Sequence, residues 1–188
     1  MSTLRVNTLT NTGNSYQISV NSIKFAYASM YYAVNDAAGS LTIATSGTNG
    51  TKMLFNNLGP SQNITANVST STWTHAYTGT YRVYTAYRQA SGGDVWTVLA
   101  VTKAGDSVAV GVSTRTGSED SHNENYTVVY TVDNTSATYQ LQHWATTTKT
   151  VSSDFQSNPG WTNYSALCGN TTGDIGRMVD YYIERIGD

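Results

Sequence analysis

The sequence predicts an all-β protein: a jelly-roll β-sandwich of about ten antiparallel strands, preceded by a short N-terminal arm. Three observations predict this fold class. The 188 residues include 14 Tyr and 16 Gly but only 2 Pro, and 12% are charged, about half of the ~25% typical of soluble domains. Short runs that alternate apolar and polar residues recur along the chain, separated by turns that contain Gly or Asn. No stretch has a helical period, and no fixed-length repeat indicates a β-solenoid.

Residues 1–21 form the predicted arm. Leu4–Val6 and Ile18–Val20 alternate with the period of a strand, and the turn residues Asn11–Asn14 lie between them. The segment has too little apolar surface to fold alone, so we expect it to rest on another surface, anchored through Leu4, Val6 and Leu9.

Residues 22–188 form the predicted head domain, in which the aromatic alternation is denser. Strand-like runs follow one another at Phe25–Tyr31, Leu41–Thr45, Lys52–Phe55, Ile64–Val68, Tyr81–Tyr87, Val95–Thr102, Ser107–Val112, Tyr126–Val132, Thr138–Trp144 and Met178–Ile186. The segments between them, such as Gly47–Gly50 and Lys103–Asp106, offer Gly or Asn for positive φ angles.

The run from Thr80 to Arg88 allows its two faces to be assigned. Tyr81, Val83, Thr85 and Tyr87 share one face, and Arg82, Tyr84, Ala86 and Arg88 share the other. Tyrosine occurs on both faces, which favours a second face covered by another subunit over one that is simply half exposed.

The net charge is −2 and the sequence pI is about 5.8, so nucleic acid and anionic membranes are not expected as partners. No apolar run approaches the ~20 residues of a membrane span, and the first residues do not resemble a secretory signal. We therefore expect the protein to be made and assembled in a cytoplasm. The single cysteine, Cys168, excludes an internal disulfide.

No cluster of residues in the sequence indicates catalysis or a cofactor. The histidines, His75, His122 and His143, lack the spacing of metal ligands, and structural or surface roles are expected for them. Nothing near Cys168 would lower its pKa, so a nucleophilic role is not expected. We expect no enzyme activity, although a pair of carboxylates suited to glycoside hydrolysis could form in the fold.

The most acidic stretch is Ser118–Glu124. Glu119, Asp120 and Glu124 could hold a hard cation, but the stretch lacks the spaced carboxylates and the glycine of a calcium loop. A solvated loop is the favoured interpretation, and no metal is expected.

The segment from Trp73 to Val83 resembles the signature of the complement-type globular head, which belongs to the tumour-necrosis-factor-like jelly-roll superfamily. Trp73, Gly79 and Tyr81 match that signature, whereas Ala76 replaces its proline and Val83 its last aromatic residue. The resemblance covers residues 22–188 in order. It implies a non-enzymatic homotrimer that packs through aromatic faces and binds ligands through surface loops.

The arm has a resemblance of its own. Residues Ser2–Gly13 are similar to the opening of structural proteins of tailed bacteriophages, particularly cyanophages, where a Leu-x-Val-x-Thr phrase often occurs. This similarity implies a virion protein whose arm contacts other virion proteins of the tail, fibre or capsid.

The sequence therefore predicts a trimeric knob on a phage particle, assembled in the host cytoplasm, that binds a bacterial surface glycan. Three alternatives stay open. The first is a capsid-surface decoration protein that stabilises the shell, the second a fibre-borne glycan hydrolase, and the third a secreted complement-like lectin.

Overall fold

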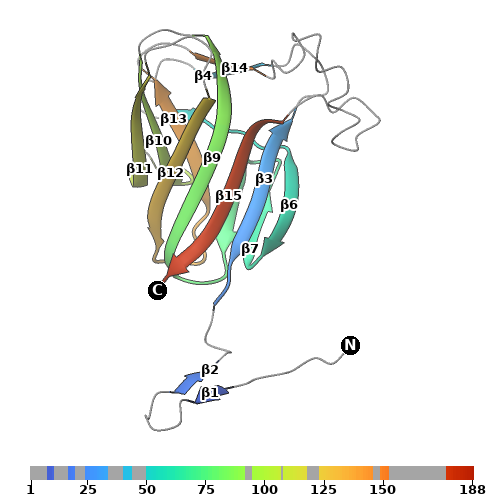
Figure 1. The fold of residues 1–188 in the computed structure, drawn as a ribbon, viewed down its shortest axis with the longest axis vertical. Coiled ribbons are helices and arrows are strands. Elements are labelled where there is room, and N and C mark those ends of the chain that lie inside the picture. Colours follow the sequence, from blue (N-terminus) through green and yellow to red (C-terminus); the bar gives the residue numbers. More distant parts are fainter. Residues whose placement is uncertain are drawn as a thin grey trace, which may run out of the picture.

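A computed structural model describes residues 8–10, 17–19, 24–33, 40–43, 50–91, 95–106, 108–117, 123–145, 149–152 and 177–188. The secondary structure within these ranges consists of β-strands joined by turns. Two sheets make up the head, as Figure 1 shows. The described residues include no helix long and apolar enough to cross a membrane.

The first sheet has the strand order β11-β10-β13-β8-β7, with β5 on β13 as an additional pair. Its strands are β11 (Ala109–Gly117), β10 (Val95–Lys103), β13 (Tyr139–Ala145), β8 (Thr72–His75), β7 (Ile64–Asn67) and β5 (Thr51–Lys52). A turn through Gly105, whose φ is 93°, joins β10 to β11 as a hairpin.

The second sheet has the strand order β4-β14-β9-β15-β3-β6, and β12 pairs with β9 beside that path. Its strands are β4 (Ser40–Ile43), β14 (Lys149–Ser152), β9 (Gly79–Ser91), β15 (Arg177–Gly187), β3 (Tyr27–Ala33), β6 (Asn57–Gln62) and β12 (Asn123–Val132). In the arm, β1 (Thr8–Thr10) and β2 (Gln17–Ser19) form a separate antiparallel pair.

From β8 to β13 the chain crosses repeatedly between the two sheets. The chain passes from β8 in the first sheet to β9 in the second, back to the β10–β11 hairpin, across to β12, and back again to β13. The first and last strands of the head, β3 and β15, pair with each other in the second sheet. This antiparallel connectivity is a jelly roll, which confirms the predicted fold class.

The alternation along β9 separates the core from the surface. Tyr81, Val83, Thr85 and Tyr87 are buried, whereas Arg82 and Tyr84 are exposed. The two faces of this strand are therefore those that the sequence predicts.

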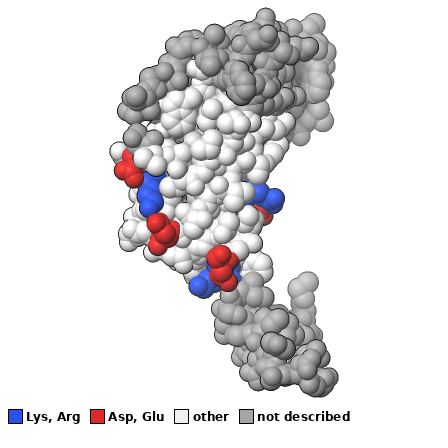
Figure 2. All heavy atoms as spheres, turned by 90° about the vertical axis from the view of Figure 1, so that its left-hand side faces the viewer, with Lys and Arg blue, Asp and Glu red and all other residues white. Residues whose placement is uncertain are grey.

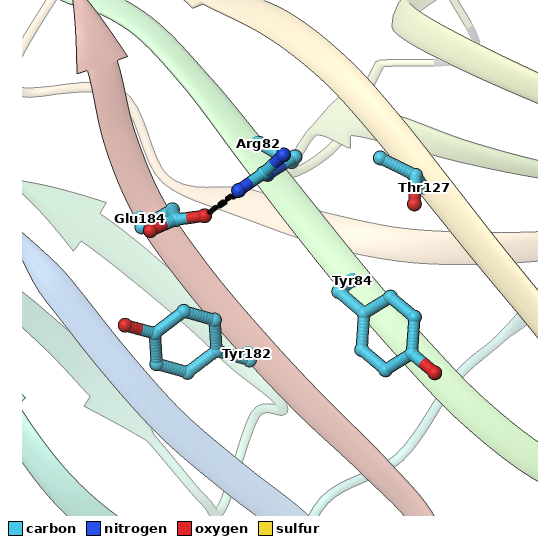
Figure 3. A pocket seen from close by; sticks show the side chains of 5 residues that line it. All are labelled: Arg82, Tyr84, Thr127, Tyr182 and Glu184. Carbon is cyan, nitrogen blue, oxygen red and sulfur yellow. Dashed lines mark hydrogen bonds and ion pairs between the residues drawn. The ribbon is translucent and has the colours of Figure 1, made fainter.

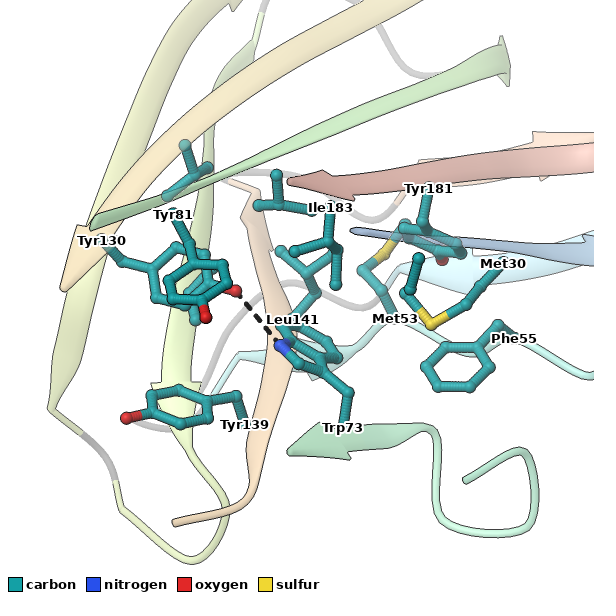
Figure 4. Close-up of a cluster of buried hydrophobic side chains, with 14 of the residues drawn as sticks. Met30, Met53, Phe55, Trp73, Tyr81, Tyr130, Tyr139, Leu141, Tyr181 and Ile183 are labelled. Atoms are coloured by element: carbon teal, nitrogen blue, oxygen red, sulfur yellow. Dashed lines mark hydrogen bonds between the residues drawn. The ribbon is translucent and has the colours of Figure 1, made fainter. Parts of the chain in front are cut away.

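The core between the sheets, part of which is drawn in Figure 4, contains 21 buried hydrophobic residues among those described, and eight of them are aromatic. Its largest fully buried side chains are those of Trp73, Tyr81, Tyr126, Tyr130, Tyr139 and Tyr181. The hydroxyl of Tyr81 donates to the carbonyl of Tyr77 and that of Tyr181 to the carbonyl of Leu54, whereas the buried hydroxyl of Tyr139 has no hydrogen-bond partner among the described residues. The core residues thus also fix the connecting segments.

His75 takes part in a buried polar cluster within this core. The indole N–H of Trp73 points to His75 Nε2 at 3.1 Å and to the Tyr130 hydroxyl oxygen at 3.2 Å, and that hydroxyl lies 3.0 Å from the same Nε2. Because an indole N–H only donates, Nε2 is the acceptor and the imidazole is neutral. Burial lowers the pKa of His75 to about 3.

A second histidine occupies a similar place farther along the core. His143 Nε2 lies 2.6 Å from the hydroxyl of Tyr87, and the ring also meets Tyr126 edge-on. His75 and His143 therefore have the structural roles expected of them. His122 lies outside the described residues.

Several strand predictions were wrong. Asn57–Gln62 is a strand although it contains Gly59 and Pro60, which is possible because β6 is an edge strand that pairs only with β3. The strands Thr72–His75 and Lys149–Ser152 are too short to show a period in the sequence. The predicted strand Lys52–Phe55 is only Thr51–Lys52.

In the arm, the structure describes the strands Thr8–Thr10 and Gln17–Ser19, and the predicted strand Leu4–Val6 lies outside the described residues. The predicted strand Ser107–Val112 has different bounds. β11 begins at Ala109 and continues to Gly117, because it pairs with the whole of β10.

Gly111 is expected to tolerate no side chain. A Cβ at this position would lie 2.4 Å from the backbone oxygen of Val129, because β11 passes directly over β12. We expect Gly111→Ala to lower the free energy of unfolding by about 1–3 kcal/mol, measured by urea denaturation. Gly187→Ala is the matched control, since its Cβ would meet only Thr80 at 3.9 Å. Equal stability of the two variants would contradict the close approach.

His75 is expected to make the fold sensitive to acid. Its pKa is about 3 in the folded chain, whereas the ordinary histidine value of 6.5 applies to the unfolded chain, so the unfolded chain binds more protons between these two values. Stability is then fully present above pH 6.5 and falls toward pH 3, in total by roughly 5 kcal/mol. Urea denaturation from pH 7 to pH 4 measures this slope, and His75→Gln should flatten it; an unchanged slope in the variant would rule out His75 as its source.

Candidate functional site

The side of the second sheet that faces away from the core is the candidate site, and we refer to it as the outer face. It is formed by alternate residues of β3, β15, β9 and β12, whose neighbours in sequence point into the core. Its described members include Tyr27, Arg82, Tyr84, Thr127, Val129, Tyr182 and Glu184.

Two rows of cross-strand partners lie at the centre of the outer face. Tyr182 of β15 is opposite Tyr84 of β9, and Tyr84 is opposite Thr127 of β12. In the neighbouring row Glu184 is opposite Arg82, and the two form an ion pair in which Arg82 Nε donates to Glu184 Oε1 at 2.9 Å (Figure 3). The charges of this row are therefore compensated within one chain.

These side chains surround a shallow, open hollow of about 460 Å³, lined by Arg82, Tyr84, Thr127, Tyr182 and Glu184. The hydroxyl of Tyr84 donates to Asn125 Oδ1 at 2.8 Å, which holds one ring in place beside the hollow. Its walls offer aromatic surface and hydroxyls for contact. Glycoside hydrolases use two carboxyl groups, whereas Glu184 is the single carboxylate among the lining residues and is paired with Arg82. The hollow therefore suits binding better than hydrolysis.

Apolar exposure is concentrated on the outer face. Tyr84 and Tyr182 are 41% and 42% exposed, and Val129, next to Arg82, is 50% exposed. Two further residues extend the apolar surface toward the end where the chain enters the head. The backbone N–H of Arg185 donates to the carbonyl of Ala26, which continues the β3–β15 pairing and places Phe25 and Ile186 on the same face.

Five of the ten large hydrophobic side chains that the described residues expose are thus on one face of one sheet: Phe25, Tyr84, Val129, Tyr182 and Ile186. Five exposed apolar side chains grouped on one face of one sheet are typical of an interaction surface. Charge is sparse on the adjoining side of the head, where acidic and basic groups lie in a few close sets on a largely uncharged surface (Figure 2).

The signature residues that the sequence predicts as important have a structural role and do not form the outer face. Trp73, Tyr81 and Val83 of the signature lie in the core. Gly79 has a φ of 134°, and a Cβ there would lie 2.5 Å from the carbonyl oxygen of Gly187, so it permits the turn into β9. These four positions stabilise the fold, and the outer face is built by other residues of β3, β9, β12 and β15.

Other predicted candidates lie where the structure describes little or nothing. Leu4, Val6, Glu119, Asp120 and Cys168 are outside the described residues. For Leu9 and Glu124 only the strand backbone is described, in β1 and β12 respectively.

Sequence reasoning identified Tyr84 but missed its partners. Tyr182, Glu184 and Ile186 alternate along the closing strand in the same way as Arg82 and Tyr84 do along β9. That alternation was visible in the sequence, but the register that puts Tyr182 opposite Tyr84 was not.

A comparison with solved structures gives 123 similar chains, three of which are described here. The chain is 8% identical to murine APRIL over 87% of this chain and 100% of that one, with a TM-score of 0.49. It is 10% identical to the Eiger TNF of S. frugiperda, over 87% and 94% of the two chains, with a TM-score of 0.49. The globular domain of zebrafish complement 1qA is 11% identical over 86% and 95%, with a TM-score of 0.43.

No family model matches the chain, and a search of curated proteins finds no match. Identities of this size say nothing about ligands or partners. The fold assignment stands on the strand order and registers described above.

Proposed function

We propose that the chain is a structural protein of a phage virion, a trimeric fibre or knob head that the N-terminal arm attaches to the particle and that binds a glycan of the host surface. The observation that carries the proposal is the outer face, with five exposed apolar side chains on a domain of low charge.

A second copy of this chain is the partner that fits the outer face. The face exposes apolar and aromatic side chains, and tyrosine is enriched in the centres of protein interfaces. The ion pair between Arg82 and Glu184 at its centre is complete within a chain, so covering these two charges leaves neither without a partner. The resemblance of the Trp73–Val83 segment to trimeric heads favours three copies over two.

The arm supports attachment to a particle. It carries a small strand pair of its own, β1 with β2, and its sequence is similar to the opening of phage structural proteins. An arm with so few apolar residues needs a partner surface, which another virion protein would supply.

Glycan binding is proposed for the loops of the head. Thr, Asn and Tyr give a surface that forms hydrogen bonds and stacking contacts without charge, as uncharged sugars require. A capsid decoration protein would use the same outer face and arm, so the two roles differ in where the head sits on the particle.

Light scattering of the purified protein tests the trimer. We expect a mass of three times the 20.3 kDa chain at micromolar concentration. Replacing both Tyr84 and Tyr182 by Ser should shift the protein toward monomers, because loss of a central tyrosine weakens an interface about thirtyfold or more.

The control variant carries Val108→Ser and Val112→Ser, which replace two exposed valines at and just before β11 of the first sheet. This variant should remain a trimer. A monomeric parent protein, or equal dissociation of both variants, would refute the outer face as the subunit interface.

Imaging of intact particles tests the virion role. We expect gold-labelled antibody against the head to decorate particles of the virus that encodes the chain, at fibre tips for a knob and over the shell for a decoration protein. A chain lacking residues 1–21 should form the same oligomer but be absent from particles. Unlabelled particles would overturn the virion role.

A further inference from the structure

Asn63 and Arg185 donate a cluster of hydrogen bonds to the segment by which the chain enters the head, and we refer to this cluster as the β3 latch. Three consecutive backbone carbonyls just before β3 each accept a hydrogen bond. Asn63 Nδ2 donates to Phe25 at 2.7 Å, the Arg185 backbone N–H to Ala26 at 2.8 Å, and Arg185 Nη1 to Lys24 at 3.4 Å.

The guanidinium of Arg185 connects this segment to two others. Its Nε donates to the carbonyl of Thr78 at 3.2 Å, and its Nη2 forms an ion pair with Asp188. The side chain is only 8% exposed, so these bonds are partly shielded from water. Room for it exists because residue 79 is glycine: a Cβ there would lie 2.8 Å from Arg185 Nη2.

The latch is also fixed to the core. The hydroxyl of the buried Tyr81 donates to the carbonyl of Tyr77, next to Thr78, and the ammonium of Lys24 lies 5.7 Å above the ring of Tyr77. Asn63 is held at a φ of 58°, a conformation that Asn tolerates better than most residues, and this aims its amide at Phe25.

The position of β3 in its sheet suits this strand to bear a pulling force. β3 lies between β15 and β6 in the second sheet and is antiparallel to both. A pull on the arm acts along β3, so it loads the ladder to β15 in shear, with many hydrogen bonds stressed together. The hydrogen bonds of the β3 latch are the first described contacts that this force meets as it passes from the arm into β3.

We propose that the β3 latch is a mechanical junction, which transmits tension from the arm into the jelly roll and keeps β3 from peeling out of its sheet. The proposal rests on the proposed function, since the arm carries load only when it is attached to a particle. When the head is bound to a host surface and the particle is pulled away, the hydrogen bonds of the β3 latch determine how long the head resists unfolding.

Single-molecule unfolding of the full chain at constant force tests this role. One handle is fused before Met1 and the other is attached to Thr114→Cys, an exposed site toward the end of β11, in a Cys168→Ser background. Asn63→Gly removes the amide donor and leaves the positive φ accessible, and Arg185→Gln removes the charged donor. We expect either change to shorten the folded lifetime under load about tenfold, because hydrogen bonds to charged or buried groups are lost.

Lys103→Gln is the matched control, because Lys103 forms its ion pair with Asp133 and makes no contact with residues 24–26. Its lifetime should equal that of the parent chain. Lifetimes of Asn63→Gly and Arg185→Gln within twofold of the parent would overturn the proposal, as would an equal loss in Lys103→Gln. If Arg185→Gln fails to fold, Asn63→Gly decides alone. The folded lifetime under force does not depend on the outcome of the antibody imaging of particles. The mechanical junction and the virion role can therefore be refuted separately.

Discussion

The pairing of β9 with β15 and β12 is the constraint on which the remaining structure depends. Tyr81, Val83, Thr85 and Tyr87 enter the core from β9, and its register with the two neighbours decides which of their residues follow them inside. Because side chains alternate along a strand, the same registers carry Tyr84 and Tyr182 to the outside as one row. A slip of one residue would bury Arg82 and expose Tyr81. The core and the outer face are therefore two consequences of one set of hydrogen bonds.

The unusual composition has a physical explanation in this arrangement. A core rich in tyrosine and histidine needs partners for its polar atoms, and the cluster of Trp73, His75 and Tyr130 joins three of them to one another. Nδ1 of His75 is buried without a hydrogen-bond partner among the described residues. Such a core gives up part of the apolar burial that aliphatic side chains would provide, but its hydrogen bonds favour one packing over others. Charge is scarce on the outer face, and Arg82 and Glu184 at its centre compensate each other, which lowers the desolvation cost when a second copy covers this surface.

Much of the fold, but little of the site, could be read from the sequence. The alternation in β9 and the turn residues around Gly105 indicated the sandwich correctly, because period and turn chemistry are local properties. The edge strand with Pro60 and the short β8 were missed, since their strand conformation comes from pairing with distant segments. The same reason applies to the outer face and the β3 latch. Tyr84 with Tyr182, and Asn63 with Phe25, are brought together by registers that no short stretch of sequence specifies.

The central claim is that the outer face is covered in the assembled protein, and hydroxyl-radical footprinting of the intact protein tests it most directly. In a single chain Tyr84 and Tyr182 are 41% and 42% exposed, whereas Tyr81 and Tyr139 are fully buried. If a second copy covers the face, Tyr84 and Tyr182 should be oxidised as slowly as the two buried tyrosines at micromolar concentration, and faster on dilution below the dissociation constant. Rapid oxidation of Tyr84 and Tyr182 at every concentration would contradict the account.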